Sequence, residues 1–472
     1  MAITLIKGGT VVSSTGRSKQ DVLIDGQTIA AVLDPSDTSL AADLTERADT
    51  VVDATGKYVI PGGIDAHTHM EMPFGGTFAS DTFETGTRAA AWGGTTTIID
   101  FAVQNKGGSV KDAIEQWHQK AAGECAIDYA FHQILGDINE QSLIDLRSLA
   151  AEGVTSFKMF TAYPGVFYST DDQIFRAMQV AAEEGLLPMM HAENGPVIDV
   201  IAEQLVKEGK TSPYYHGIAR PWEMEEEATH RTIMLSRVAH SPVYIVHVTA
   251  KQAMRQVQAA RADGHLVFGE SCPQYLYQSL EEQLGAPGFE GAKYVCSPPL
   301  RSKEEGHQED LWMALRTDAL SVVATDHCPF CMKQKQMGAN DFRKIPNGMG
   351  LVEHRMDLMY QGTVNGRISL ERFVDITSTG PARIFGLYGR KGVITPGADG
   401  DVVVYDPNGS TTIGINDTHH MNLDYSNFEG WHIDGHVDTV LSRGKVVVDE
   451  TGYVGTKGDG EFVACKPSQM IG

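Results

Sequence analysis

The sequence predicts an α/β fold, namely a (β/α)8 TIM barrel with a small β-sandwich domain formed by both chain termini. Apolar, β-rich runs alternate with amphipathic helical stretches through the middle of the 472-residue chain. Short strand-like runs of a different style occupy the two ends, and each end is too small to bury a core alone. The length suits one large barrel with a smaller module.

Eight apolar runs supply the predicted barrel strands. They cover residues 57–67, 95–103, 127–135, 154–160, 186–193, 242–248, 265–271 and 320–327. Helical stretches separate them, and the one over 171–185 follows the capping residue Thr170 and stops at Gly185. Near-continuous apolar strands between helices indicate a parallel sheet that is covered on both faces, and eight such units indicate a barrel.

The flanks set the predicted domain boundaries. Residues 1–56 carry short strands, and residues 392–454 return to that style in GADGDVVVYDP. We therefore expect 57–391 to form the catalytic barrel, while the two flanks pair into one sandwich. Residues 455–472 show no pattern, and we expect them to form a tail at a subunit interface.

The composition excludes several classes of protein. The formal net charge is −23, from 38 Lys and Arg against 61 Asp and Glu, so we expect no nucleic-acid partner. No apolar run approaches the roughly 20 residues that a membrane span needs, and the N-terminal segment does not resemble an export signal. The six scattered cysteines fit a reducing compartment. These observations predict a cytoplasmic protein with no membrane partner.

Four histidines and one aspartate end the predicted strands. His67 and His69 end the first strand, His191 the fifth, His247 the sixth and Asp326 the eighth. Each could be an ordinary core or capping residue, but such residues would scatter along the strands. The carboxyl ends of barrel strands converge on one face, so the shared position predicts a metal site. Imidazole and carboxylate ligands suit Zn²⁺, with Mn²⁺, Co²⁺ or Fe²⁺ as alternatives.

Lys158, in the fourth predicted strand, is the exception at this end, because an ammonium group repels cations. Its neighbours Phe157, Met159 and Phe160 are apolar, and desolvation favours the neutral amine. A neutral amine reacts with CO₂ to give a carbamate, whose oxygens can bridge two ions about 3.5–4 Å apart. Five other ligands are too many for one tetrahedral ion, so a bridged pair is expected. The alternative is an unmodified lysine that packs in the wall and reaches solvent.

These residues belong to longer segments that resemble a known family. The segments are PGGIDAHTHMEMPFGGT (61–77), SFKMFTAYPG (156–165), HAENG (191–195), GESCPQYL (269–276), YVCSPPLR (294–301), ATDHCPF (324–330) and IPNGMGLVEHR (345–355). Together they resemble the dihydropyrimidinase/hydantoinase branch of the amidohydrolase superfamily over nearly the whole chain. The resemblance implies two Zn²⁺ ions per subunit, one held by His67, His69 and Asp326. His191 and His247 would hold the other ion, and carboxylated Lys158 would bridge both.

The resemblance also implies a substrate pocket at matching positions. Tyr163 would donate a hydrogen bond to the substrate carbonyl as it becomes an oxyanion, and Ser297 and Asn347 would bind the cyclic imide. A hydrophobic gate for the ring substituent would consist of three aromatic residues, Phe74, Phe160 and Phe167, although core packing is an equal explanation for the last two.

The implied reaction is hydrolysis of a small cyclic amide. A hydroxide that bridges the two ions would open a 5,6-dihydropyrimidine or hydantoin ring to an N-carbamoyl amino acid, and Asp326 would carry the proton. The alternatives are an allantoinase or another cyclic imide or ureide hydrolase, a mononuclear deaminase, and a non-catalytic scaffold homologue. Glu71 counts against a dihydroorotase, which typically has an arginine there. The family suggests a homotetramer.

Two further groups fall outside this set. Cys328 and Cys331 form a single C-x-x-C, which does not predict a zinc ribbon, but Cys331 is placed where it could contact the metal. Four histidines of the C-terminal module are interpreted as structural: His419, His420, His432 and His436.

Overall fold

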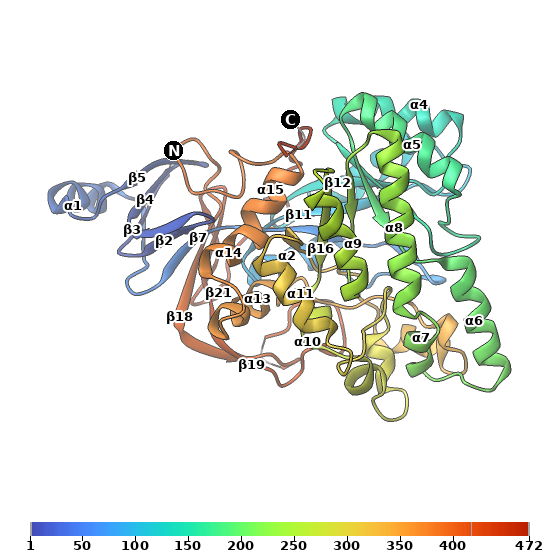
Figure 1. Ribbon diagram of the computed structural model, residues 1–472. Helices are drawn as coiled ribbons and strands as arrows, with labels where there is room; N and C mark the ends of the chain where they lie inside the picture. The colour runs from blue at the N-terminus through green and yellow to red at the C-terminus, as the bar shows by residue number, and fades with distance from the viewer. Residues whose placement is uncertain (1, 417, 471–472) are drawn as a thin grey trace.

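The computed structural model describes residues 2–416 and 418–470, and an eight-stranded parallel sheet forms its centre (Figure 1). In chain order the strands are β8 (Gly63–Thr68), β11 (Thr95–Val103), β12 (Asp128–Ile134), β13 (Ser156–Phe160), β14 (Leu187–His191), β15 (Val243–Ile245), β16 (Val267–Ser271) and β17 (Val322–Val323). Each pairs with the next, and a parallel bridge between Thr68 and His327 joins the first strand to the residues after the last. The predicted barrel is confirmed.

Helices between the strands cover the outside of the barrel (Figure 1). The longer ones are α2 (Phe83–Trp92), α3 (Val110–Ala121), α4 (Glu140–Leu149), α5 (Asp171–Glu184), α6 (Gly195–Lys207), α8 (Trp222–Ala239), α9 (Lys251–Ala262), α11 (His307–Arg316) and α13 (Arg355–Val364). The shorter ones are α7 (Tyr214–Ile218), α10 (Pro273–Tyr277), α12 (Met332–Lys335), α14 (Leu370–Val374) and α15 (Gly380–Ile384). Helix α5 begins after Thr170 and ends at Gly185, whose φ of 70° is left-handed, as the sequence predicts.

Two further sheets form the terminal module; the first contains N-terminal strands only, and the second combines strands from both ends of the chain (Figure 1). One has the order β5 (Thr28–Leu33), β4 (Asp21–Asp25), β1 (Ile3–Lys7) and β6 (Thr50–Asp53). The other has the order β21 (Gly452–Tyr453), β20 (Lys445–Asp449), β19 (His432–Ser442), β18 (Val402–Thr412), β7 (Tyr58–Pro61), β2 (Thr10–Ser13) and β3 (Gly16–Lys19). Ile24 and Val22 from one end share a buried cluster with Val402 and Leu441 from the other. A ten-residue helix, α1 (Thr38–Arg47), has no buried residue and lies at the edge of this module (Figure 1).

The prediction of one continuous strand over 57–67 is wrong. Residues 58–61 form β7 of the terminal module, and the barrel strand β8 begins at Gly63. The hydrogen bonding changes between the two glycines, because the Gly62 amide donates to Asp401 while the Gly63 amide donates to Gly94. A Cβ at position 62 would lie 2.1 Å from Thr96 Oγ1, so only glycine fits this crossing point.

The tail after residue 454 packs on the barrel of its own chain. The Tyr129 amide of β12 donates to the Glu461 carbonyl, and the Val463 amide donates to the Tyr129 carbonyl. The Phe462 ring lies 5.5 Å from that of Phe131. Contact with a neighbouring subunit stays a prediction for this segment.

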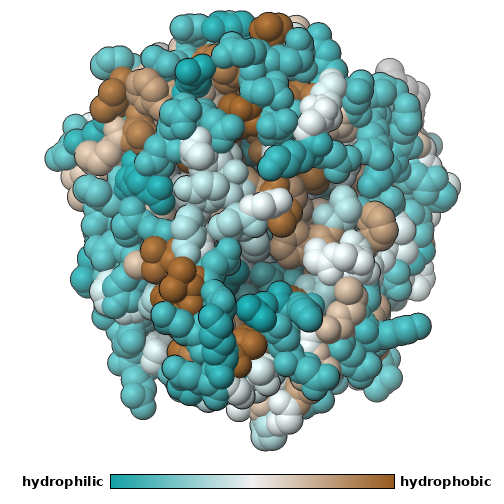
Figure 2. All heavy atoms as spheres, turned by 90° about the vertical axis from the view of Figure 1, so that its right-hand side faces the viewer, coloured by the Kyte–Doolittle hydropathy of each residue, from teal (hydrophilic) through white to brown (hydrophobic). Residues whose placement is uncertain are grey.

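The surface agrees with the acidic composition. The face turned toward the viewer in Figure 2 is mostly hydrophilic, and its hydrophobic groups are separated from one another. In the described part of the chain, no helix has both the length and the apolar character needed to cross a membrane. The six cysteines, all in that part, are unpaired.

Candidate active site

The structure brings the six predicted metal ligands together at the carboxyl ends of the barrel strands. His67, Lys158 and His191 lie on β8, β13 and β14, whereas His247 and Asp326 lie just beyond β15 and β17. The side chains of the first four are almost fully buried, and that of Asp326 is 13% exposed. One pocket is lined by five of the predicted ligands: His69, Lys158, His191, His247 and Asp326.

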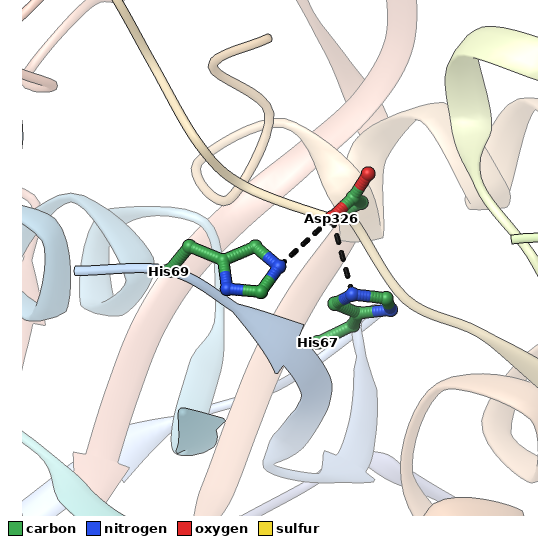
Figure 3. A group of neighbouring side chains, drawn as sticks. All are labelled: His67, His69 and Asp326. Atoms are coloured by element: carbon green, nitrogen blue, oxygen red, sulfur yellow. Dashed lines mark ion pairs between the residues drawn. The ribbon is translucent and has the colours of Figure 1, made fainter. Parts of the chain in front are cut away.

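The Asp326 carboxylate contacts both His67, on β8, and His69, in the loop that follows β8. Its Oδ1 lies 3.1 Å from His67 Nε2 and 3.2 Å from His69 Nε2, and Figure 3 shows both rings turned toward the carboxylate. Lys158 Nζ lies 2.8 Å from the same His67 nitrogen. Four groups from three separate strand ends therefore face a common point, as metal ligands must.

His191 and His247 form the second part of the cluster. Their ring centroids are 4.5 Å apart, and the His247 ring stacks 5.5 Å from that of His67. Three residues of this face hold left-handed backbone angles, with φ of 38° at His247, 53° at Asp326 and 60° at Tyr163. Non-glycine residues rarely adopt such angles, and they concentrate at functional sites, where the surrounding structure holds them in place.

The electrostatics of the cluster favour metal binding. Burial lowers the pKa of His69 to about 3 and that of His247 well below its usual value, so both rings are neutral and have a free lone pair. Burial would raise the pKa of Asp326, but His67 and His69 outweigh it and hold the pKa well below the usual range. Burial also lowers the pKa of the Lys158 amine.

The donor set fits a pair of divalent transition ions. It consists of four imidazoles and one carboxylate, and each is a ligand type that Zn²⁺ accepts. His247 Nδ1 is buried and has no hydrogen-bond partner among the described residues. Buried polar atoms without a partner are uncommon in folded proteins, so its presence here supports a missing ligand. His67, His69 and Asp326 place three donor atoms within 4.8 Å of one another.

The predicted substrate-binding residues line the same pocket. Asn347 Nδ2 donates to Ser297 Oγ at 2.9 Å, so these two polar side chains lie next to each other. Burial raises the pKa of Tyr163 to about 12, which keeps its hydroxyl protonated and able to donate.

The three predicted gate residues form one aromatic wall. The rings of Phe160 and Phe167 stack at 5.0 Å, and Phe74 lies parallel to Phe167 at 6.4 Å. Phe160 and Phe167 are 4% and 7% exposed, so they serve the core and the pocket wall at once.

Comparison with known proteins is consistent with this geometry. The sequence pattern of the amidohydrolase family matches residues 58–447. The chain belongs to the amidohydrolase family. It is 56% identical to a D-hydantoinase from Streptomyces coelicolor over 99% of both chains, and 47% identical to one from Geobacillus stearothermophilus over 97% of this chain and 96% of that one. The crystal structure of dihydropyrimidinase from Brevibacillus agri is 46% identical, with a TM-score of 0.94 over 98% of this chain and 99% of that one. The predicted family, its hydantoinase branch and the hydrolase class are confirmed.

Glu270 is a site residue of this amidohydrolase that sequence reasoning missed. It lies on β16, fully buried, and its carboxylate bonds His67 Nδ1. Tyr244 donates to its other oxygen at 2.7 Å, and the His247 amide donates to the first at 3.2 Å. The carboxylate fixes the ring orientation that directs His67 Nε2 at Lys158 and Asp326. The segment GESCPQYL contributes to the family resemblance, but no role followed for Glu270, and only its position at a strand end gave a signal.

We expect Glu270→Gln to weaken metal binding by about 10–100-fold, because a partner that orients a ligating histidine contributes roughly that much affinity. Equilibrium dialysis of the apoprotein against Zn²⁺ measures it. Tyr244→Phe is the matched control, since it keeps the contact between Glu270 and His67 and should change the affinity only a few-fold. Equal Zn²⁺ affinity in Glu270→Gln and wild-type protein would contradict the assigned role.

A second missed pair holds His191 in the amidohydrolase site. Glu193 accepts a hydrogen bond from His191 Nε2 at 2.7 Å and pairs with Arg220 at 3.1 Å. Burial would raise the pKa of Glu193, but Arg220 and His191 outweigh it and lower the pKa to about 2. With Nε2 occupied in this way, Nδ1 is the His191 atom that remains for a metal. The Arg220 guanidinium also lies 5.7 Å from the Tyr163 ring.

The structure corrects the placement of the two neighbouring cysteines. Cys331 does not line the pocket, and its Sγ lies 3.7 Å from the Asn422 carbonyl, so the predicted contact with the metal is wrong. Cys328 lines the pocket instead. Burial raises the pKa of the Cys328 thiol, which keeps it uncharged beside Asp326.

Proposed function

We propose that the chain hydrolyses the ring of a small cyclic amide, a 5,6-dihydropyrimidine or a hydantoin, to an N-carbamoyl amino acid. The observation that carries this proposal is the convergence of Lys158, Asp326 and three histidines on one pocket that Tyr163 and Asn347 also line. The fourth histidine, His67, contacts Lys158 and Asp326 from behind this lining. Relatives named D-hydantoinase and dihydropyrimidinase over almost the full chain support the substrate class.

Two Zn²⁺ ions per subunit fit the ligand set best. His67, His69 and Asp326 would hold one, His191 and His247 the other, and a carbamate on Lys158 would join them. Burial lowers the pKa of the Lys158 amine, and this supports the carbamate, because only a neutral amine adds to CO₂. When bound, such a pair lowers the pKa of a shared water toward neutrality and polarises a substrate carbonyl.

Asp326 is the proposed proton carrier. Its carboxylate is ionised, partly exposed to the pocket and held by the two histidines of the β8 end. It can therefore accept a proton from the attacking water and return it to the ring nitrogen as the carbon–nitrogen bond breaks. The backbone at residue 326 is left-handed, with φ of 53°, a conformation that concentrates at functional sites.

Tyr163 supplies the proposed hydrogen bond to the developing oxyanion. Its hydroxyl keeps a proton up to a pH near 12, and its own left-handed backbone and contact with Phe74 fix the ring. Ser297 and Asn347 would bind the remaining imide groups. The aromatic wall of Phe74, Phe160 and Phe167 would then contact the substituent on the ring.

A substrate panel tests the proposed function. Purified protein loaded with Zn²⁺ is assayed against dihydrouracil, hydantoin, phenylhydantoin and allantoin, and the N-carbamoyl product is quantified. We expect turnover of the first three and little of allantoin, since the apolar wall offers no partner for a ureido group. Preference for allantoin would favour the allantoinase alternative, and absence of turnover with all four would overturn the proposal.

We expect Tyr163→Phe to lower kcat by about 10²–10³-fold, because one donor to a developing oxyanion contributes that much. The metal content and KM should stay near those of the wild type. Tyr168→Phe, five residues away on the same loop, is the control and should stay within twofold. Loss of bound metal in Tyr163→Phe would show instead that the ring supports the ligands.

The assembly and the compartment are also inferred. We infer a homotetramer, which the family resemblance supports, and sedimentation velocity tests it. Six unpaired cysteines support a reducing, cytoplasmic environment.

A further inference from the structure

Two clusters of potential metal ligands lie outside the active site. The first contains three buried carboxylates, Asp128, Asp399 and Asp401. Lys391 already occupies its centre, with Nζ at 2.5 Å, 2.9 Å and 2.6 Å from the three. The amine is therefore the cation of that cluster, and no ion is needed there.

The second cluster has no such cation. It contains Glu353, His354 and His419, which place one donor atom each within 4.8 Å of one another. Glu353 and His354 are 5% and 3% exposed, and they directly precede α13. His419 comes from the segment between β18 and β19, so the cluster joins the barrel to the C-terminal part of the chain. Among the described residues, Glu353 has no ion pair with a lysine or arginine.

The hydrogen bonding of His419 prepares its ring for a metal. His419 Nε2 lies 2.7 Å from the Leu423 carbonyl, which can only accept, so Nε2 must carry a proton. In the neutral ring Nδ1 then has the free lone pair. That atom is buried and has no partner among residues 2–416 and 418–470. An imidazole with one nitrogen bonded to a carbonyl and the other free is the usual state of a metal-ligating histidine.

His354 also has a ring nitrogen that is free for a metal, independently of His419. Its side chain is almost fully buried, and its Nε2 also has no hydrogen-bond partner in the part of the chain that the structure describes. A buried imidazole nitrogen without a partner destabilises the folded protein unless a ligand satisfies it.

Glu353 is held in place by the next histidine along the loop. The His420 amide donates to Oε2 at 2.7 Å, and His420 Nδ1 lies 2.5 Å from Oε1. Trp92 stacks on the His420 ring with the centroids 3.9 Å apart, which fixes that ring in turn. Each carboxylate oxygen keeps a second lone pair, so Glu353 remains able to bind an ion.

A cavity of about 240 Å³ lies beside the cluster and gives room for water ligands. Glu353, His354 and His420 line it, as does Asp357 one helical turn further along the chain. The Asp357 carboxyl accepts a hydrogen bond from Tyr405 at 3.0 Å, and its second oxygen can accept another from a metal-bound water.

We propose that Glu353, His354 and His419 form a third metal site, which binds a divalent first-row transition ion such as Zn²⁺. Two imidazoles and one carboxylate are borderline ligands that suit Zn²⁺, whereas Mg²⁺ and Ca²⁺ prefer oxygen ligands alone. The site shares no residue with the active site. An ion there links the start of α13 to the segment between β18 and β19 and thereby stabilises the attachment of the C-terminal part to the barrel.

Counting bound ions tests this proposal. The full-length protein is stripped with a chelator and dialysed against Zn²⁺, and the zinc per chain is measured. We expect His419→Gln to bind one ion per chain fewer than the wild type while it keeps the wild-type hydrolytic activity. Glutamine retains an N–H for the Leu423 carbonyl, so the loop keeps this bond. The same zinc count in both proteins would overturn the proposal.

His436→Gln is the matched control. His436 lines the same cavity and also has a buried, unpartnered Nδ1, but it is not one of the three clustered donors. Its zinc count should equal that of the wild type, and a loss equal to that in His419→Gln would overturn the assigned ligand set. Added Zn²⁺ should also raise the Tm of His436→Gln apoprotein by more than that of His419→Gln. Equal shifts would overturn the linking role.

Discussion

Lys158→Ala is expected to abolish turnover and leave the fold intact. In the proposed site a carbamate on Lys158 would hold both metal ions in place. Two such ions would contribute several kcal/mol of transition-state stabilisation, so we expect a loss of about 10³-fold or more. The methyl group of alanine cannot carry CO₂. The barrel should survive, because Lys158 forms no ion pair with a carboxylate of the described residues, and the aromatic residues around it, such as Phe101 and Phe160, remain packed.

Chemical rescue makes this prediction specific. Acetate or propionate fits the space that the side chain vacates and offers two oxygens as the carbamate does, so a concentration-dependent return of part of the activity is expected. The exposed Lys333→Ala, at the same face of the barrel, is the control. Zinc per chain, kcat with and without acid, and circular dichroism are the measurements. An unchanged rate in Lys158→Ala would exclude the bridging role.

The convergence of the ligands could be predicted because a parallel barrel gives all its strands the same direction. His67 and Asp326 are 259 residues apart, but each ends a strand of the same sheet, so their contact follows from the strand pattern. The helix over 171–184 could also be predicted, because a capping threonine marks its start and a left-handed glycine marks its end. These signals are local and do not depend on the packing of distant segments.

The partners behind the ligands could not be predicted in the same way. Glu270 lies 203 residues from His67 in the sequence. From the sequence alone, a glutamate at the end of an apolar strand could equally be a helix cap or a surface residue. Its contact depends on which face of β16 turns inward and on the exact register of three strands. Arg220 depends on the path of the loop before α8, which no periodic pattern describes.

The change of sheet at Gly62 shows a second limit of sequence reasoning. The apolar run over 57–67 is continuous, so hydrophobicity alone predicts one strand. The boundary between the two sheets follows from the hydrogen bonds of the two glycines. The Gly62 amide donates to residue 401, whereas the Gly63 amide donates to residue 94. Only the paired glycines signal this in the sequence, since a close backbone approach requires them.

Asp326→Asn is expected to separate metal binding from proton transfer. Asparagine keeps one oxygen in the position that faces His67 and His69, so most of the bound zinc should remain. Its amide cannot take up a proton near neutral pH, and a general base contributes about 10²–10⁴-fold, so kcat should fall by that factor. KM should change little, because the carboxylate binds no part of the substrate in the proposed mechanism. Asp199→Asn, an exposed carboxylate at the outer mouth, is the control.

The pair of measurements decides between two roles for this residue. If Asp326 only holds a metal, zinc content and kcat should fall together in Asp326→Asn, and added Zn²⁺ should restore both. If Asp326 also carries the proton, saturating Zn²⁺ should restore the metal content and leave kcat low. The ionised state of Asp326 favours the second outcome, because an ionised carboxylate can accept a proton. Wild-type kcat in the zinc-loaded variant would remove Asp326 as the proton carrier and assign that step to another group of the pocket.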